Sequence, residues 1–150
     1  MSIKIIDLLD HIPAKSAHLL VALLMVLTLA GCGKSVETGT LTGKVTYKGQ
    51  PLEFGSVMLQ PKDGGPVARG TIGADGTYSM AIDGKPGAPI GVNQVRVTCF
   101  TSQRPGADSG GEKSVGDSLI PERYSRFSSS GLLVEVRPGE NPPYDIELTD

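Results

Sequence analysis

This sequence predicts an all-β domain folded as an antiparallel sandwich, and three observations lead to that prediction. Short segments alternate apolar and polar side chains with a period of two, as strands with one buried face do. The chain has 20 Gly and 11 Pro in 150 residues, so it is rich in turns. After Cys32 no segment shows the apolar period of 3.6 that an amphipathic helix needs. Regular strands and turns of this kind are typical of a sandwich.

Seven strands are expected, and turn residues separate them. In chain order they cover residues 41–48, 54–60, 67–72, 77–82, 95–99, 132–137 and 144–149. The pairs Asp63-Gly64, Asp75-Gly76 and Asp83-Gly84 fit tight turns, because glycine adopts the positive φ that such turns demand. Residues 101–118 hold Ser, Gly, Asp and Lys with scarcely an apolar side chain, so a flexible loop is expected there.

The N-terminal segment has the features of a signal helix. Every residue from 19 to 30 is apolar except Thr28, and as a helix this run spans roughly 18 Å, too little for a bilayer. A secretory signal has an apolar stretch of this length followed by small residues. The next residues, Leu29-Ala30-Gly31-Cys32, resemble the lipobox of bacterial lipoproteins at all four positions.

The lipobox resemblance implies that the Cys32 thiol carries diacylglycerol and that a signal peptidase recognises Leu29, Ala30 and Gly31. Cleavage before Cys32 frees an amino group for a further acyl chain such as palmitate, and two or more chains anchor a protein stably in a membrane. Because Gly33 rather than aspartate follows Cys32, the resemblance favours the outer over the inner membrane in a cell that has both. The alternative is that Cys32 is only a small buried hydrophobe.

These features divide the chain into three parts. Residues 1–31 are the expected signal peptide, residues 32–40 the lipidated N-terminus and a polar spacer, and residues 41–150 the β domain. One feature departs from an export signal, which normally starts positively charged. The side chains before the apolar run sum to zero charge, because Lys4 and Lys15 are balanced by Asp7 and Asp10.

Composition excludes several classes of function. A net charge of −2 with 14 Lys and Arg is not the footprint of a nucleic-acid binder. His11 and His18 both precede Cys32, so the processed chain lacks imidazole for a catalytic triad or a zinc site. Cys99 falls on the apolar face of a strand and is expected in the core. No metal or cofactor is expected, because the three Asp-Gly pairs lie in separate turns rather than in one calcium loop.

Several motifs resemble those of carboxypeptidase regulatory-like, transthyretin-like domains. Residues 42–52 fit the family's opening motif, in which Gly-x-Val is followed by Gly-x-Pro-Leu, and residues 75–78 fit its later Asp-Gly-x-Tyr turn. Further segments resemble small bacterial lipoproteins built on that domain: 86–91, 95–97, 120–125 and 129–132. The chain departs from the family at Asn93-Gln94, where an aromatic residue is usual, and at residues 71–73. The resemblance implies a seven-stranded Greek-key, prealbumin-like sandwich with a non-catalytic accessory role.

The richest polar cluster follows Pro121 and contains Glu122, Arg123, Tyr124 and Arg126. Two interpretations are open. In the first, Arg123, Tyr124 and Arg126 form a ligand patch for anions or glycans, with Tyr124 stacking and the arginines donating hydrogen bonds. In the second, Tyr124 closes one end of the sandwich and the charges face water.

The sequence therefore predicts a membrane-anchored lipoprotein of the cell envelope that acts as a non-catalytic structural or interaction module. Its expected partners are the membrane, through Cys32, and envelope proteins or glycans. The alternative is a carbohydrate- or peptide-binding accessory module at the cell surface. A hydrolase would draw its carboxylates from Asp108, Glu112 and Asp117, but a flexible loop does not hold such groups at a fixed separation.

Overall fold

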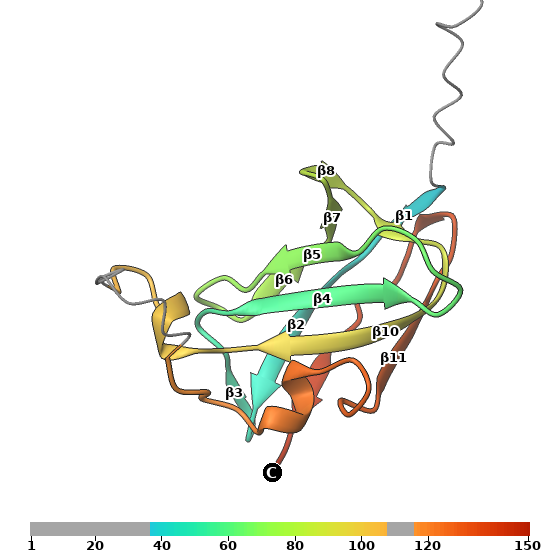
Figure 1. Ribbon diagram of the computed structural model, residues 1–150. Coiled ribbons are helices and arrows are strands. Elements are labelled where there is room, and N and C mark those ends of the chain that lie inside the picture. The colour runs from blue at the N-terminus through green and yellow to red at the C-terminus, as the bar shows by residue number, and fades with distance from the viewer. Residues whose placement is uncertain (1–36, 108–115) are drawn as a thin grey trace, which may run out of the picture. The chain divides into compact units, whose positions relative to one another are not determined.

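The computed structural model describes residues 37–107 and 116–150, all of which belong to one unit spanning Val36–Asp150. These residues form thirteen strands and two short 3-10 helices, with no α-helix among them (Figure 1). The all-β prediction is therefore confirmed. Within the same residues, no helix has the length and apolar character needed to cross a bilayer.

The strands are β1 (Thr38–Thr40), β2 (Thr42–Tyr47), β3 (Gln50–Pro51), β4 (Ser56–Pro61), β5 (Ala68–Thr71), β6 (Thr77–Ser79), β7 (Ala81–Ile82), β8 (Lys85–Pro86), β9 (Ala88–Pro89), β10 (Gly91–Thr98), β11 (Leu132–Val136), β12 (Gly139–Glu140) and β13 (Ile146–Leu148). The 3-10 helices are η2 (Thr101–Gln103) and η3 (Glu122–Ser125). Each of the seven expected segments overlaps a strand, although β10 begins at Gly91, four residues before the expected segment 95–99. The described residues nevertheless hold more than seven strands, because 77–82 divides at Met80 and short strands occur where turns were expected.

The larger sheet is antiparallel and has the strand order β11-β10-β4-β5-β7-β8. Its centre is the long pair β4 and β10, which runs in register from Asn93 opposite Pro61 to Thr98 opposite Ser56 (Figure 1). β-Branched residues at alternate positions suit such a pair, because they pack well on a pleated surface. The strands β11 and β8 form the two edges.

The smaller sheets are built around β1 and β2, which follow one another with only Leu41 between them. On one side lie β12 and β13, and on the other lie β9, β6 and β3. β12 is parallel to β1 and β13 is parallel to β2. The prediction of a purely antiparallel sandwich is therefore wrong here. No hairpin fixes the direction of these strands, because the chain passes from the larger sheet to the smaller sheets between β11 and β12.

Two stretches of chain belong to both layers. β6 pairs with β2, whereas β7, which follows Met80, pairs with β5. Likewise β9 pairs with β1, and β10, which follows Ile90, pairs with β4. The residue at each crossing still bonds to the smaller sheets. The N–H of Met80 donates to the Leu41 carbonyl at 3.0 Å, and the N–H of Ile90 donates to the Glu37 carbonyl at 3.4 Å.

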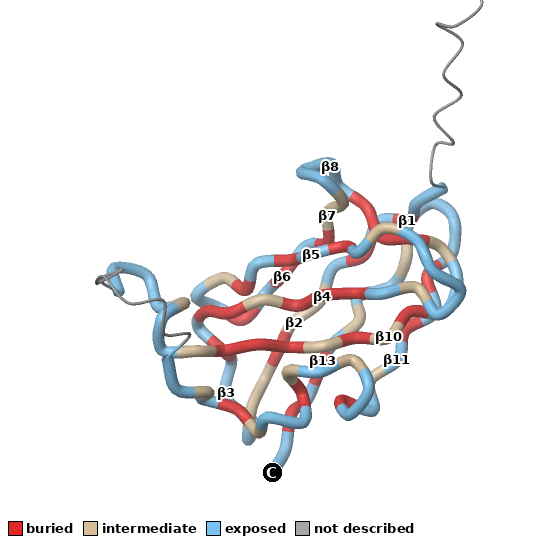
Figure 2. The backbone as a smooth tube through the Cα atoms, viewed as in Figure 1, coloured by how far each residue is buried: buried red, intermediate tan, exposed pale blue. Residues whose placement is uncertain are grey.

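One core fills the space between the layers, as in a β-sandwich. Its buried side chains include Val57, Leu59, Val95 and Val97 from the larger sheet, and Leu41, Val45, Ile146 and Leu148 from the smaller ones. Buried segments run along β4 and β10 in Figure 2. Each buried aliphatic side chain contributes roughly 1.5–3 kcal/mol, and this layer of aliphatic residues holds the sheets together.

The hairpin turns follow their sequence signals. Tyr47 pairs with Gln50 across a two-residue turn in which Lys48 and Gly49 have φ of 52° and 77°. Ile82 pairs with Lys85 in the same way across Asp83 and Gly84, with φ of 49° and 78°. Two successive positive φ values define the turn whose twist matches that of a hairpin.

Two expected boundaries change. The polar spacer was expected to reach residue 40, but Thr38–Thr40 form β1 and pair with β9 and β12. The expected loop 101–118 starts with the helix η2, and its ends are joined by a bridge between Phe100 and Ser118. Residues 108–115, with Asp108 and Glu112, lie outside the described residues.

Candidate functional site

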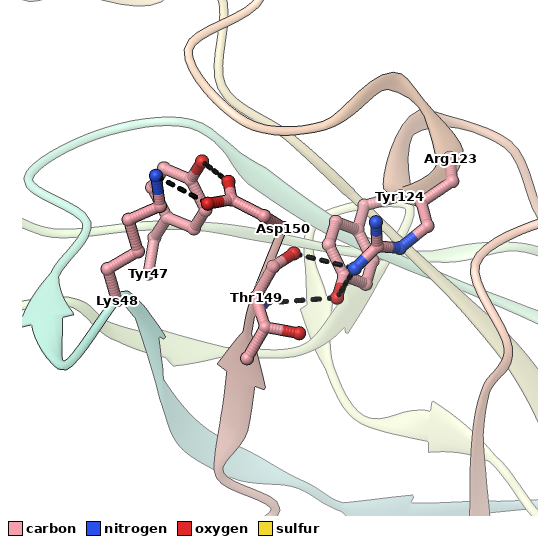
Figure 3. Close-up of polar contacts among 6 residues, drawn as sticks. All are labelled: Tyr47, Lys48, Arg123, Tyr124, Thr149 and Asp150. Carbon is pink, nitrogen blue, oxygen red and sulfur yellow. Dashed lines mark hydrogen bonds and ion pairs between the residues drawn. The ribbon is translucent and has the colours of Figure 1, made fainter.

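Tyr124, the centre of the predicted ligand patch, is buried with 5% of its surface exposed. It lies in η3, and its phenol oxygen accepts hydrogen bonds from the Thr149 N–H at 3.1 Å and from Arg123 Nη2 at 2.8 Å (Figure 3). Burial by itself raises the pKa of Tyr124, but the bonds from Thr149 and Arg123 and the arginine charge outweigh it and lower the pKa below its usual value. The Tyr124 phenol is therefore enclosed by the chain itself, next to Thr149.

Arg123 completes the same contact. Its guanidinium lies 4.5 Å from the centre of the Tyr124 ring, and Nη2 also donates to the carbonyl oxygen of Thr149 at 2.6 Å. The Leu148 carbonyl accepts from the Lys48 N–H on the β2 side, so both backbone groups of the next residue, Thr149, point away from β2. Arg123 and Tyr124 thus bind the outer edge of the chain where β13 ends.

Arg126 is not brought into this contact. It forms an ion pair with Glu122 at 3.5 Å, four residues earlier, and both side chains are largely exposed. Exposed pairs of this kind contribute little to stability. The structure therefore joins Arg123 to Tyr124 and leaves Arg126 on the surface.

On the other side of Thr149, the Asp150 carboxylate holds the β2–β3 turn. It accepts from the Tyr47 hydroxyl at 2.6 Å and pairs with Lys48 Nζ at 2.7 Å (Figure 3). The pKa of Asp150 is lowered mainly by the hydrogen bond from Lys48 and next by that from Tyr47. The pKa of Lys48 is raised mainly by its hydrogen bond to Asp150 and next by its contact with Tyr47. Lys48 and Asp150 form the ion pair of this contact, and Tyr47 adds a neutral hydrogen bond.

The segment that contains η3 also packs on the outer face of β10. Arg96 of β10 donates through Nη1 to the Ser125 carbonyl at 3.3 Å, and its guanidinium lies 5.1 Å from the Phe127 ring centre. The Ser130 hydroxyl, almost fully buried, donates to the Val95 carbonyl at 2.5 Å. These contacts cover the β10 face up to the start of β11.

The outer edge of β11 has no such cover from residues 37–107 and 116–150. The Val92 carbonyl accepts from the Lys62 N–H on the β4 side, so the odd-numbered residues of β10 direct their backbone groups to β11. Their partners on β11 are Leu132, Val134 and Val136. The N–H and C=O groups of Leu133 and Glu135 consequently point away from the sheet, and none of the described residues bonds to them.

Two shallow grooves open on the described surface. One, of about 560 Å³, is lined by Thr38, Thr40, Thr42, Pro86, Gly139, Glu140 and Asn141. The other, of about 540 Å³, lies over β2 and β6 and includes Lys44, Tyr78 and Asp145. Two of its polar side chains bond to the protein itself: the Tyr78 hydroxyl donates to the Tyr144 carbonyl at 2.5 Å, and Asp145 accepts from the Lys44 N–H at 2.9 Å.

Cys99 is buried in the core with a free thiol, which confirms its expected place. Burial raises its pKa, and the charge of Arg104 offsets part of that effect. Within residues 37–107 and 116–150, no three His, Cys, Asp or Glu side chains lie close enough together to hold a metal ion. All seven aromatic residues of the chain lie in these ranges, and each is buried or half-buried.

The predicted lipidation site lies outside the described residues. This applies to Cys32 and to the expected signal-peptidase residues Leu29, Ala30 and Gly31. Lipidation at Cys32 and cleavage before it stay predictions.

No protein-family model matches the chain, and no curated protein does. The chain is similar to a DUF3823 family protein from Parabacteroides merdae, whose crystal structure has been solved. The two are 19% identical with a TM-score of 0.36, and the match covers 77% of this chain. It covers 47% of the other, so this chain spans about half the length of that protein.

Sequence reasoning missed two features of the surface. The bond from Arg123 and Tyr124 to Thr149 joins residues 25 apart or more, and nothing in the local pattern indicates it. The free edge of β11 depends on the strand order. Its signal in the sequence is only that residues 132–136 contain no proline and place Leu133 on the polar face.

Proposed function

We propose that this protein is a lipid-anchored lipoprotein of the cell envelope, and that its β domain acts as a non-catalytic structural or interaction module. The observation that carries the proposal is the sequence Leu29-Ala30-Gly31-Cys32 at the end of an apolar run too short to cross a bilayer. In this proposal Cys32 is the anchor, residues 1–31 are removed, and the short segment before β1 separates the lipid from the domain.

The geometry of the described residues supports a non-catalytic role. Arg123, Tyr124 and Asp150, which form the densest polar cluster, bond to groups of the chain itself. In the groove over β2 and β6, the Tyr78 hydroxyl and the Asp145 carboxylate do so as well. A catalytic site needs a nucleophile, base or acid that is free to meet a substrate, and these side chains are already engaged.

The finer fold is part of the same proposal. We assign the domain to the transthyretin-like, carboxypeptidase regulatory-like class with Greek-key connections. Its support is the position of the family-like motifs. The Lys48-Gly49 turn with Pro51 and Leu52 after it joins β2 to β3, and Asp75-Gly76 stands directly before β6.

The anchor is tested by expressing the full chain with Cys32→Ser and following membrane partition and the mass of the N-terminal peptide. The expected result is that the natural chain partitions into detergent and starts at a diacylated Cys32, whereas the variant does neither. Cys99→Ala is the matched control, because it removes the other cysteine, and it should leave both readouts unchanged. Unaltered partition of Cys32→Ser would overturn the proposal.

The same experiment, with the two membranes separated, tests which membrane holds the anchored chain. Because Gly33 follows Cys32, we expect the processed chain in the outer-membrane fraction of a cell with two membranes, and Gly33→Asp to shift it to the inner-membrane fraction. Recovery of both chains in the inner membrane would contradict this part of the proposal.

One alternative has an observation in its favour. A peptide-binding role is supported by the free backbone groups of Leu133 and Glu135 on β11. A carbohydrate-binding role is not supported in this way, because Tyr124 is buried and Tyr144 is half-buried against the core. Sugar rings need an aromatic face to stack on, and none of the seven aromatic residues is exposed.

A further inference from the structure

The edge strands of this protein differ in how they are protected. β8 and β3 are two residues long and contain Pro86 and Pro51. β13 is preceded by Pro142 and Pro143 and is bound at its end by Arg123 and Tyr124. Short length, proline and side-chain cover are three of the means, besides charged side chains, of preventing an edge from pairing with another chain. β11 has five residues, no proline and no side-chain cover along its outer edge from the part of the chain that the structure describes.

The surface beside the β11 edge has two properties that bear on what could pair with it. Leu133 is 49% exposed, and Val92 on the neighbouring strand is 43% exposed, so apolar surface adjoins the edge. Glu135 stands opposite Val92 and forms no ion pair with any described residue. The outward row of β11 thus consists of one apolar side chain and one unpaired carboxylate.

A second copy of this chain complements the side chains of the β11 edge poorly in an antiparallel, two-fold arrangement. A two-fold axis at Val134 sets each Glu135 carboxylate against the apolar Leu133 of the other copy. An axis at Glu135 sets two carboxylates opposite one another, and directly opposed like charges destabilise a strand pair.

The two remaining self-pairings also fail. An axis at Leu133 would pair Leu133 with its own copy and Glu135 with Gly131. Gly131 has a φ of 69° and is not extended, so only the Leu133 pair is left. An axis at Val136 would join Glu135 to Arg137 of the other copy. However, the N–H and C=O of Arg137 are already bonded to the Asn141 side chain, at 2.9 and 2.8 Å.

We propose that β11 is the docking edge for an extended segment of another protein, which adds an antiparallel strand to the sheet. The segment carries a basic side chain opposite Glu135 and an apolar side chain opposite Leu133, in the order basic-x-apolar along its chain. Its backbone bonds to the free N–H and C=O groups of Leu133 and Glu135, in the manner of strand addition. This inference rests on the proposed role as an interaction module and names the chemistry of its partner.

The probe is a blocked threonine heptapeptide with lysine at its third position and valine at its fifth. Its effect is read by amide hydrogen exchange on the full chain purified in detergent. The amides of Leu133 and Glu135 should exchange fast in the free protein and slow by about tenfold when the peptide is present at ten times its dissociation constant. The Val134 amide, which faces β10, should be slow in both states.

Charge exchange provides the control. Glu135→Lys should weaken the lysine peptide by about two- to five-fold and strengthen the matching glutamate peptide, as expected for an opposed charge pair. Glu147→Lys makes the same change at an exposed residue of β13 and should alter neither affinity. Leu133→Pro removes an outward N–H together with the apolar side chain and fixes φ at this position. It should abolish slowing at Glu135, and a Val134 amide that stays slow shows that the sheet is intact.

Three results would overturn the inference. They are unchanged exchange at Leu133 and Glu135 with saturating peptide, an equal effect of Glu147→Lys and Glu135→Lys, and a dimer of the natural chain that Leu133→Pro dissociates in sedimentation. The last would assign the edge to a second copy. None of them affects the partition of Cys32→Ser, so failure of this inference is distinguishable from failure of the proposed anchor.

Discussion

The phenol oxygen of Tyr124 lies 3.1 Å from the backbone nitrogen of Thr149 and accepts its hydrogen bond. With Arg123 bound to the carbonyl of the same residue, both backbone groups of Thr149 have partners although no strand lies on that side. The bond from the Thr149 N–H to Tyr124 is partly buried, and a backbone group that lacks a partner in such a place is costly. The loop between β10 and β11 therefore fixes the last strand of the sandwich.

Removing the Tyr124 hydroxyl should destabilise the domain. Tyr124→Phe leaves the Thr149 N–H without its acceptor and should lower the free energy of unfolding by about 1–2 kcal/mol. Tyr124→Ala also leaves a cavity and should cost about 3–5 kcal/mol. Urea unfolding measures both, and Tyr47→Phe, which removes a hydroxyl bound only to exposed Asp150, should have a much smaller effect. Equal losses for Tyr124→Phe and Tyr47→Phe would contradict this role.

The contact of Asp150 should make stability depend on pH in the acid range. Lys48 and Tyr47 lower the pKa of Asp150 in the folded protein below its value in the unfolded chain. The stabilisation is therefore complete above the unfolded pKa and is lost as the pH falls through the folded one. Asp150→Asn should remove this part of the acid dependence, and added salt should weaken it because the pair is exposed. A melting curve series from pH 2 to 7 that is identical for both chains would disprove it.

The thiol of Cys99 should be unreactive in the folded protein. The residue is 2% exposed, and burial raises the pKa of its thiol, so little thiolate is present and it is poorly accessible. In the Cys32→Ser chain, where Cys99 is the remaining thiol, alkylation should be slow in buffer and rapid in denaturant. Mass spectrometry over time measures this, and rapid modification of the folded chain would show that the thiol is accessible.

Gly43 should not tolerate a side chain. A Cβ at this position would overlap the backbone carbonyl oxygen of Tyr144, just before β13. Gly43→Ala should destabilise the domain by about 1–3 kcal/mol, the usual range for overpacking. Gly73→Ala is the control, since its Cβ would meet nothing closer than the Asp75 carboxylate at 3.3 Å. Similar unfolding midpoints for the two variants would contradict the close approach.

The strands of this protein are well predicted from local pattern, because alternation reports which face of a strand is buried. Val45, Val57 and Val97 are all fully buried, as their alternating positions indicate. The short strands β1 and β12 lack this signal, since a strand of three residues or fewer has too few side chains to show a period. The division at Met80 is also hidden, because both halves of 77–82 continue the same alternation while pairing with different sheets.

The candidate site is less predictable because it depends on tertiary contacts. The sequence singles out Arg123, Tyr124 and Arg126 as neighbours, yet only the first two meet Thr149, whereas Arg126 pairs with Glu122. Strand direction is equally hidden: the parallel pairing of β13 with β2 depends on where the chain changes layers. Local pattern gives faces and turns, while pairing partners and edges follow from the path of the whole chain.

The parallel pairs at this side of the domain have a mechanical consequence. β1 and β2 lead away from residue 37, and β12 and β13 run alongside them in the same direction toward Thr149. A force that pulls residues 37 and 149 apart therefore acts along both strands and loads their hydrogen bonds together in shear, instead of opening them one at a time. Force spectroscopy between these two points should record a single high unfolding peak, so that tension along the chain is borne by the strands where it enters and leaves the domain.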